Sequence, residues 1–183
     1  MMENKQIDAW KEELRNTHLP RWDELPDIEI YMDQLITLLD RYTTNFHIDS
    51  HQEKLVTASM VNNYVKQKLI PAPIKKKYNQ RHLARLIVIT ILKQAFDIPA
   101  IKKGIEWQTH SGDYQTAYDQ FCAQTEATIR LFLEDDPQIP FTLDKVEIDF
   151  LPIQMATITL TSKLVAEKSL NTLLSEMTIN PKE

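Results

Sequence analysis

Two asparagines and a run of lysines are the side chains of this sequence whose types and spacing most favour a chemical role. Asn62 and Asn63 lie in the segment LVTASMVNNYVKQKL, and Lys75, Lys76 and Lys77 follow in IPAPIKKKY. An asparagine side chain donates and accepts hydrogen bonds, as the edge of adenine requires, and lysines neutralise phosphates. The pattern therefore indicates recognition of a polyanion, with nucleic acid as the leading candidate.

The charge distribution favours the same kind of partner. Residues 55–103 contain ten Lys or Arg and a single acid, Asp97, so their local net charge is +9, whereas the whole chain carries −5. A basic region is thus held within an otherwise acidic protein, which is typical of nucleic-acid binding. Each feature has a plainer alternative. An acid-free helix face can simply be solvated, and on the helix pattern alone solvation and nucleic-acid binding carry equal weight. Solvated loops also often carry lysine runs.

The residues that enzymes and metal sites use do not occur in a recognisable pattern. The only glycines, Gly104 and Gly112, cannot form a phosphate-binding loop, and the motifs His-Glu-x-x-His and Gly-x-Ser-x-Gly are absent. Cys122 is the single cysteine, so a disulfide framework and a thiolate metal cluster are excluded. His47 and His51 are expected to be loop residues. We predict no enzymatic activity, no metal and no cofactor.

The N-terminal sequence and the hydrophobic pattern indicate the location of the protein. The first 16 residues lack the apolar stretch of a signal peptide, and no window approaches 18 to 20 uncharged apolar residues. We expect a cytoplasmic protein that does not enter the membrane.

The elements that must position these residues are predicted to be helices. Glycine is scarce, and nine prolines separate the apolar repeats, as in helices joined by short turns. We expect an N-terminal extension over residues 1–26 with a short helix near 6–16, and a domain over residues 27–110. The helices of that domain are expected at 27–42 with Asp27 as the N-cap, after Thr57 or Ser59, at 80–95 after Asn79, and from Ile98 to near Trp107.

Residues 111–183 are expected to form a helical C-terminal region. Apolar residues repeat at helical spacing over about 113–135 and 153–177, whereas residues 146–150 alternate as a short strand would, although a loop is favoured there. The two helices either complete a monomeric core or pair with a second copy, and we favour a homodimer. A small-molecule effector is unknown: the aromatic residues Tyr114, Tyr118, Phe121 and Phe132 fit ordinary core better than a ligand pocket.

The segment from Leu55 to Ile105 resembles the DNA-binding domain of MerR-type transcription regulators. The exit Leu69-Ile70-Pro71, the basic loop that ends in Tyr78 and the capping Asn79 carry the resemblance. The motifs VNNYVKQ, LIPAPIKKKY and LIVITILKQ are closer still to a family of small bacterial MerR-like proteins of unassigned function. The resemblance covers residues 19 to about 105. It departs at Lys68, where MerR-type proteins usually have glycine, and in a shorter basic loop.

The resemblance implies an all-α fold in which a winged helix-turn-helix module is followed by long amphipathic C-terminal helices. The expected function is that of a sequence-specific transcription regulator that binds double-stranded DNA. The alternative is a protein-interaction adaptor that keeps the winged-helix framework. On the first hypothesis, Ser59, Asn62, Asn63 and Lys66 face the major groove, Tyr64 packs or touches the DNA backbone, and the phosphates are contacted by Lys75, Lys76, Lys77, Arg81 and Arg85.

Overall fold

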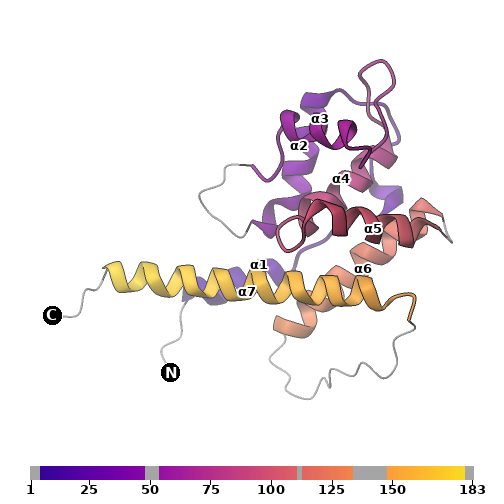
Figure 1. The fold of residues 1–183 in the computed structure, drawn as a ribbon. Helices are drawn as coiled ribbons and strands as arrows, with labels where there is room; N and C mark the ends of the chain where they lie inside the picture. Colours follow the sequence, from indigo (N-terminus) through magenta and orange to yellow (C-terminus); the bar gives the residue numbers. More distant parts are fainter. Residues whose placement is uncertain (1–4, 48–53, 111–112, 134–147, 180–183) are drawn as a thin grey trace.

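The architecture is all-helical over the described part of the chain. A computed structural model describes residues 5–47, 54–110, 113–133 and 148–179 (Figure 1). The α-helices are α1 (Lys5–Arg15), α2 (Met32–Thr43), α3 (Ala58–Lys66), α4 (Gln80–Leu92), α5 (Ile98–His110), α6 (Tyr114–Leu133) and α7 (Leu151–Ile179). Two short 3-10 helices are η1 (Trp22–Glu24) and η2 (Thr44–Phe46). The expectation of an all-α protein is confirmed at this level.

Helix α4 is the centre of the fold. It contacts α2, α5, α6 and α7, and its sequence QRHLARLIVITIL is apolar around most of the helix, as a helix packed on several sides requires. Its buried residues include Leu83, Leu86, Ile87 and Ile91. Asn79 is the N-cap, since its side chain accepts from the backbone N–H of His82 at 3.2 Å. The predicted cap and the buried character of this helix are both confirmed.

The pairing of α6 with α7 forms the other end of the molecule, which lies at the bottom of Figure 1. Phe121, Cys122 and Ile129 of α6 are buried in the same core as Leu160 and Leu164 of α7. The hydroxyl groups of Thr128 and Thr157 lie 3.1 Å apart across the two helices. The buried Cys122 thiol has a pKa raised to about 12 by burial, so it stays protonated near neutral pH.

The N-terminal segment packs onto α6. Helix α1 contacts α6, and the hydroxyl of Tyr118 donates to the carbonyl of Pro20 at 2.8 Å. One hydrophobic cluster runs from Leu14 to Leu164 and so crosses both of the domain boundaries expected at residues 26 and 110. The division into three parts remains a prediction.

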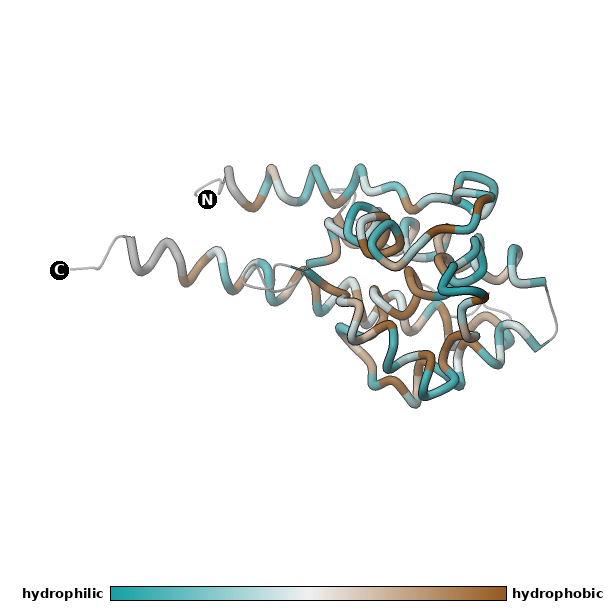
Figure 2. Tube along the Cα trace, turned by 90° about the horizontal axis from the view of Figure 1, so that it is seen from above, coloured by the Kyte–Doolittle hydropathy of each residue, from teal (hydrophilic) through white to brown (hydrophobic). Residues whose placement is uncertain are grey.

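Figure 2, turned by 90°, separates α1 from the outer part of α7, which overlap in Figure 1. Both helices lead out of the body on the same side, and the body lies at their inner ends. Leu170, Leu173 and Leu174 on the outer part of α7 are 55%, 52% and 51% exposed. An apolar face of α7 therefore reaches beyond the core.

Two expected elements differ from the structure. Helix α2 begins at Met32 with Tyr31 as its N-cap, not at Asp27, because Ile30 is held in extended conformation by a backbone pairing with Tyr78. Asp27 is exposed and caps no helix. Residues 148–150 form a turn before α7, and the rest of the stretch considered for a strand lies outside the described residues, as does His51.

Candidate nucleic-acid interface

Helix α3 presents a polar face that contains no acid. Thr57, one of the two residues predicted as possible caps, caps the helix by accepting from the backbone N–H of Met60 at 3.3 Å. Val61 and Tyr64 are buried, so the opposite face is directed to solvent. The exposed residues of that face, which line a shallow depression beside Met60, are Ser59, Asn62, Asn63 and Lys66. Hydroxyl, amide and ammonium groups on one short helix supply both donors and acceptors.

The helix ends in a Schellman motif that uses a lysine. The N–H of Leu69 bonds to the carbonyl of Tyr64 at 2.9 Å, and the N–H of Lys68 bonds to that of Val65 at 3.0 Å. Lys68 adopts a left-handed conformation with φ of 56°, where glycine is the usual residue and a side chain costs ~1 kcal/mol. Lys68, which stands where MerR-type proteins usually have glycine, therefore adopts the backbone conformation that glycine would adopt there. Lys68 is exposed and adds a cation beside α3 that we did not select from the sequence.

The basic segment after Pro73 is a tight β-hairpin, which we call the lysine hairpin (residues 74–77). Ile74 and Lys77 exchange both backbone hydrogen bonds, at 2.9 and 3.2 Å. Lys75 and Lys76 form the turn with φ of 50° and 65°, the two left-handed positions of a type I′ turn. Asn-Gly is the favoured pair there, so two exposed lysines occupy positions that strain their backbone.

The base of the lysine hairpin is fastened to the segment before α2. Tyr78 and Ile30 exchange two backbone hydrogen bonds of 2.8 Å each. Lys77 lies 3.6 Å from the carboxylate of Glu29, and its Nζ is 5.7 Å from the centre of the Tyr31 ring. Within the described residues, neither Lys75 nor Lys76 has an ion-pair partner, so the two charges at the tip are directed to solvent.

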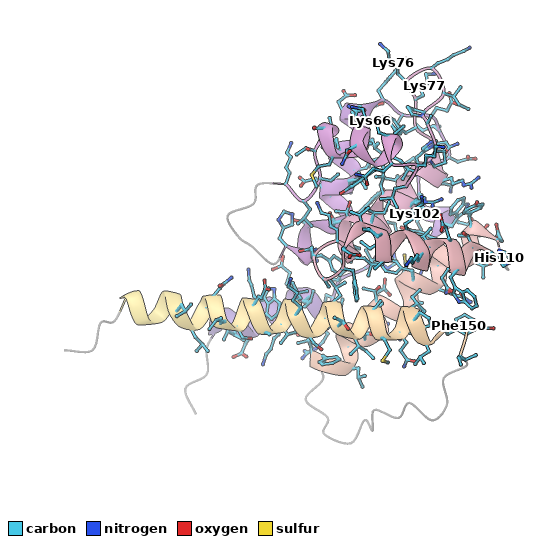
Figure 3. All side chains as sticks on the ribbon, in the orientation of Figure 1. Lys66, Lys76, Lys77, Lys102, His110 and Phe150 are labelled. Carbon is cyan, nitrogen blue, oxygen red and sulfur yellow. The ribbon has the colours of Figure 1, made fainter. Side chains whose placement is uncertain are left out.

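Helix α3 and the lysine hairpin lie at the same end of the molecule. The loop that joins α3 to α4 rises beside α3 at the top of Figure 1, far from α7. Figure 3 places Lys66 of α3 and Lys76 and Lys77 of the hairpin at that end. Lys66 of the exposed α3 face and the lysines of the hairpin therefore share one end of the molecule.

Three of the residues named for the DNA interface lie away from the exposed face of α3 and the lysine hairpin. Tyr64 is only 4% exposed, and burial raises the pKa of its hydroxyl, so it packs in the core, which is the first of the two roles expected for it. Arg81 and Arg85 line a cavity between α4, α5 and α6, and the guanidinium of Arg81 stacks 3.5 Å above the ring of Tyr114. The register of α4 directs these arginines into that cavity, where they are not grouped with the lysine hairpin.

The described residues contain no group of three or more His, Cys, Asp and Glu side chains that could hold a metal ion. In the same part of the chain, no helix combines the length and the apolar character that a bilayer crossing requires.

These observations define an all-helical protein with an exposed, acid-free helix face beside a basic hairpin. The chain belongs to a family described as a domain of unknown function (DUF1836), whose model matches residues 20–121. This match covers α2 to α5, the lysine hairpin and the first part of α6. No curated protein and no solved structure matches the chain.

The family match corrects the resemblance drawn from the sequence. No MerR or helix-turn-helix family model matches this chain, so its assignment to the MerR-like proteins is wrong. The motifs that suggested it, a capped apolar helix after a basic loop and a Pro-containing helix exit, are local solutions to helix ends and turns that unrelated helical proteins can share.

Proposed function

We propose that this protein is a sequence-specific transcription regulator that binds double-stranded DNA through α3 and the lysine hairpin. The observation that carries the proposal is that an exposed, asparagine-bearing helix without acids lies at the same end of the molecule as two exposed hairpin lysines, which have no ion-pair partner among the described residues. In this arrangement α2 and α3 act as a helix-turn-helix and the hairpin acts as its wing.

The dimensions and chemistry of α3 support insertion into the major groove. Nine residues at ~1.5 Å each span ~13 Å, which suits a groove ~12 Å wide. Asn62 and Asn63 can each pair with N6 and N7 of adenine, and Ser59 and Lys66 can contact either bases or phosphates. The burial of Val61 and Tyr64 fixes which face of α3 the groove would meet.

The strain in the lysine hairpin supports a role for its charges. Left-handed conformations cost ~1–2 kcal/mol for a residue other than glycine, and Lys75 and Lys76 both adopt them. A stable hairpin alone would be better served by Asn-Gly. Lysines at such positions are consistent with selection for two ammonium groups at the tip of a projection, where they reach phosphates on either side of the groove.

We propose further that the protein acts as a homodimer through the outer part of α7. The helix has 29 residues and is ~43 Å long, and Leu170 and Leu173 are each about half exposed on a segment that extends beyond the body. A second copy would cover this apolar face and would present two α3 helices to two half-sites.

The test is selection of bound fragments from sheared genomic DNA, followed by sequencing, with the full chain. We expect a short enriched motif, which the variants Asn62→Ala and Asn63→Ala alter at defined positions, because each good bidentate pair contributes ~1–3 kcal/mol of discrimination. Asn171→Ala on α7 is the matched control and should retain the wild-type motif. Binding without enrichment would remove sequence specificity, and no binding at low salt would favour the adaptor hypothesis.

A further inference from the structure

A cavity of about 270 Å³ lies on the side of α4 that faces α5, α6 and the first turns of α7. Its wall is largely aromatic and aliphatic, and three of the four aromatic residues singled out on α6, Tyr114, Tyr118 and Phe121, belong to it, whereas Phe132 is 42% exposed outside it. Trp107, which is 54% exposed, stands where the cavity meets solvent. Tyr118 and Phe121 are buried in the core, as preferred for this cluster, and the cavity lies against them.

The described lining of the cavity contains two guanidinium groups and no carboxylate. Among the described residues, Arg81 and Arg85 are the only charged side chains of this lining, and neither has an ion-pair partner there. The guanidinium of Arg81 lies over the Tyr114 ring, with its Cζ 3.5 Å from the ring centre, and a cation held in this way can still donate from its N–H groups. The Nε atoms of both arginines are shielded from solvent without a hydrogen-bond partner in the described structure.

A buried N–H donor without a hydrogen-bond acceptor lowers the stability of the protein, unless a bound ligand accepts its hydrogen bond. An unsatisfied buried donor costs ~1–3 kcal/mol, and more when it is charged. Burial lowers the pKa of Arg85, while Tyr114 and the nearby Glu106 act in the opposite direction. Glu106 is mostly exposed on α5, lies 4.0 Å from Lys102 and does not belong to the cavity lining. The site keeps a positive charge that an anion would balance.

Gly104 adds an observation from the opposite wall. It lies inside α5, where glycine costs ~1 kcal/mol relative to alanine, and its φ is negative, so no backbone geometry requires it. A Cβ placed there would meet no atom within 4 Å. Gly104 is among the residues that line the cavity, so a large side chain at this position is a test of the space there.

We propose that this cavity binds an organic monocarboxylate with a compact apolar or aromatic body. The carboxylate would accept hydrogen bonds from Arg81 and Arg85, in the planar geometry that guanidinium and carboxylate groups share. The apolar body would replace water against Trp22, Phe96 and Phe121. A hydrophobic wall with only two charged groups suits a monoanion better than a strongly hydrated phosphate.

The experiment measures calorimetric binding of three probes to the full chain: octanoate, 3-phenylpropionate and indole-3-acetate, each beside its primary amide. We expect at least one acid to bind at least tenfold more tightly than its amide. Arg85→Met should remove that tenfold preference, and Gly104→Leu should weaken the acid and its amide alike. Arg41→Met on the exposed side of α2 is the matched control and should leave both affinities unchanged.

Several results would overturn the proposal. The first is that none of the three acids binds at millimolar concentration. The second is that each acid and its amide bind with equal affinity. The third is that both Arg85→Met and Arg81→Met keep the preference for the acid. Circular dichroism of each variant shows whether it is folded, and Gly104→Leu provides a test in which both arginines are kept. Because no DNA is present, these outcomes do not depend on the proposed function.

Discussion

Ile30 and Tyr78 exchange both of their backbone hydrogen bonds, each 2.8 Å long, across 48 positions of the sequence. This pairing holds the segment before α2 against the base of the lysine hairpin. Tyr78 is buried, and its ring meets His82 of α4 edge-on with centres 5.5 Å apart. The hairpin therefore projects from a fixed base, and the position of Lys75 and Lys76 relative to α3 is set by the core.

Replacement of the hairpin tip should separate stability from DNA binding. Lys75→Asn with Lys76→Gly installs the favoured type I′ pair and should raise the free energy of unfolding by ~1–2 kcal/mol. The same double variant should bind DNA more weakly, because two ammonium groups are lost. Urea denaturation and a gel-shift assay measure the two effects. A variant that is more stable and equally tight on DNA would remove the hairpin from the interface.

The ion pair between Arg21 and Glu126 should be a main support of the N-terminal segment. The guanidinium donates to both carboxylate oxygens at 2.8 and 2.7 Å, and the N–H of Leu19 donates at 2.8 Å to the same carboxylate, whose side chain is 6% exposed. Glu126→Gln should lower the free energy of unfolding by ~2 kcal/mol, because Arg21 loses a buried charge partner. Glu12→Gln, in an exposed pair with Arg15, should change it by less than ~0.5 kcal/mol. Equal effects in thermal melts would contradict this account.

The same carboxylate should make stability depend on pH. Burial tends to raise the pKa of Glu126, but the hydrogen bonds from Arg21 and Leu19 and the charge of Arg21 outweigh it, so the pKa lies below its ordinary value. A carboxyl whose pKa is lower in the folded state stabilises the fold above the unfolded value of ~4.3, and this contribution disappears as the pH falls through the folded pKa. The stability difference between wild type and Glu126→Gln should therefore shrink below ~pH 4. A constant difference down to pH 2 in urea titrations would show that the charge of Glu126 is not involved.

Charges on the outer part of α7 should dissociate the proposed dimer. Leu170→Glu with Leu173→Glu alters side chains that are 55% and 52% exposed, so the fold of one copy should be retained. In analytical ultracentrifugation at micromolar concentration, the wild type should sediment as a dimer and the double variant as a monomer. Asn171→Glu introduces a charge in the same segment and should leave the dimer largely intact. A wild-type protein that is monomeric at these concentrations would exclude the dimer.

Local patterns predicted much of the fold. The caps Thr57 and Asn79, the buried face of α4 and the approximate range of α6 follow from helical periodicity and from side chains that bond their own backbone. Such signals lie within a few residues of one another, so they can be read without knowledge of the tertiary structure. The start of α2 could not be predicted in this way, because the pairing of Ile30 with Tyr78 joins distant segments.

The candidate site was predicted only in part, because local patterns show which residues are exposed but not how distant segments pack together. The exposed asparagines and lysines follow from composition and helix pattern, whereas Arg81 and Arg85 are equally basic and were grouped with them. Their direction depends on the packing of α4 against α5 and α6, which no local pattern encodes. The left-handed turn at Lys75 and Lys76 could not be predicted from the sequence either, since residue preferences favour Asn-Gly in such a turn.

The salt dependence of DNA binding tests the central claim most directly. The logarithm of the binding constant of the full chain is measured against the logarithm of salt concentration, from about 50 to 200 mM. The account predicts a steep negative slope for the wild type and, for Lys75→Ala with Lys76→Ala, a slope smaller by about two, one for each lost phosphate contact. Lys168→Ala on α7 should keep the wild-type slope. The account is contradicted if the slope of the double variant equals that of the wild type, or if the wild type binds no DNA at 50 mM salt.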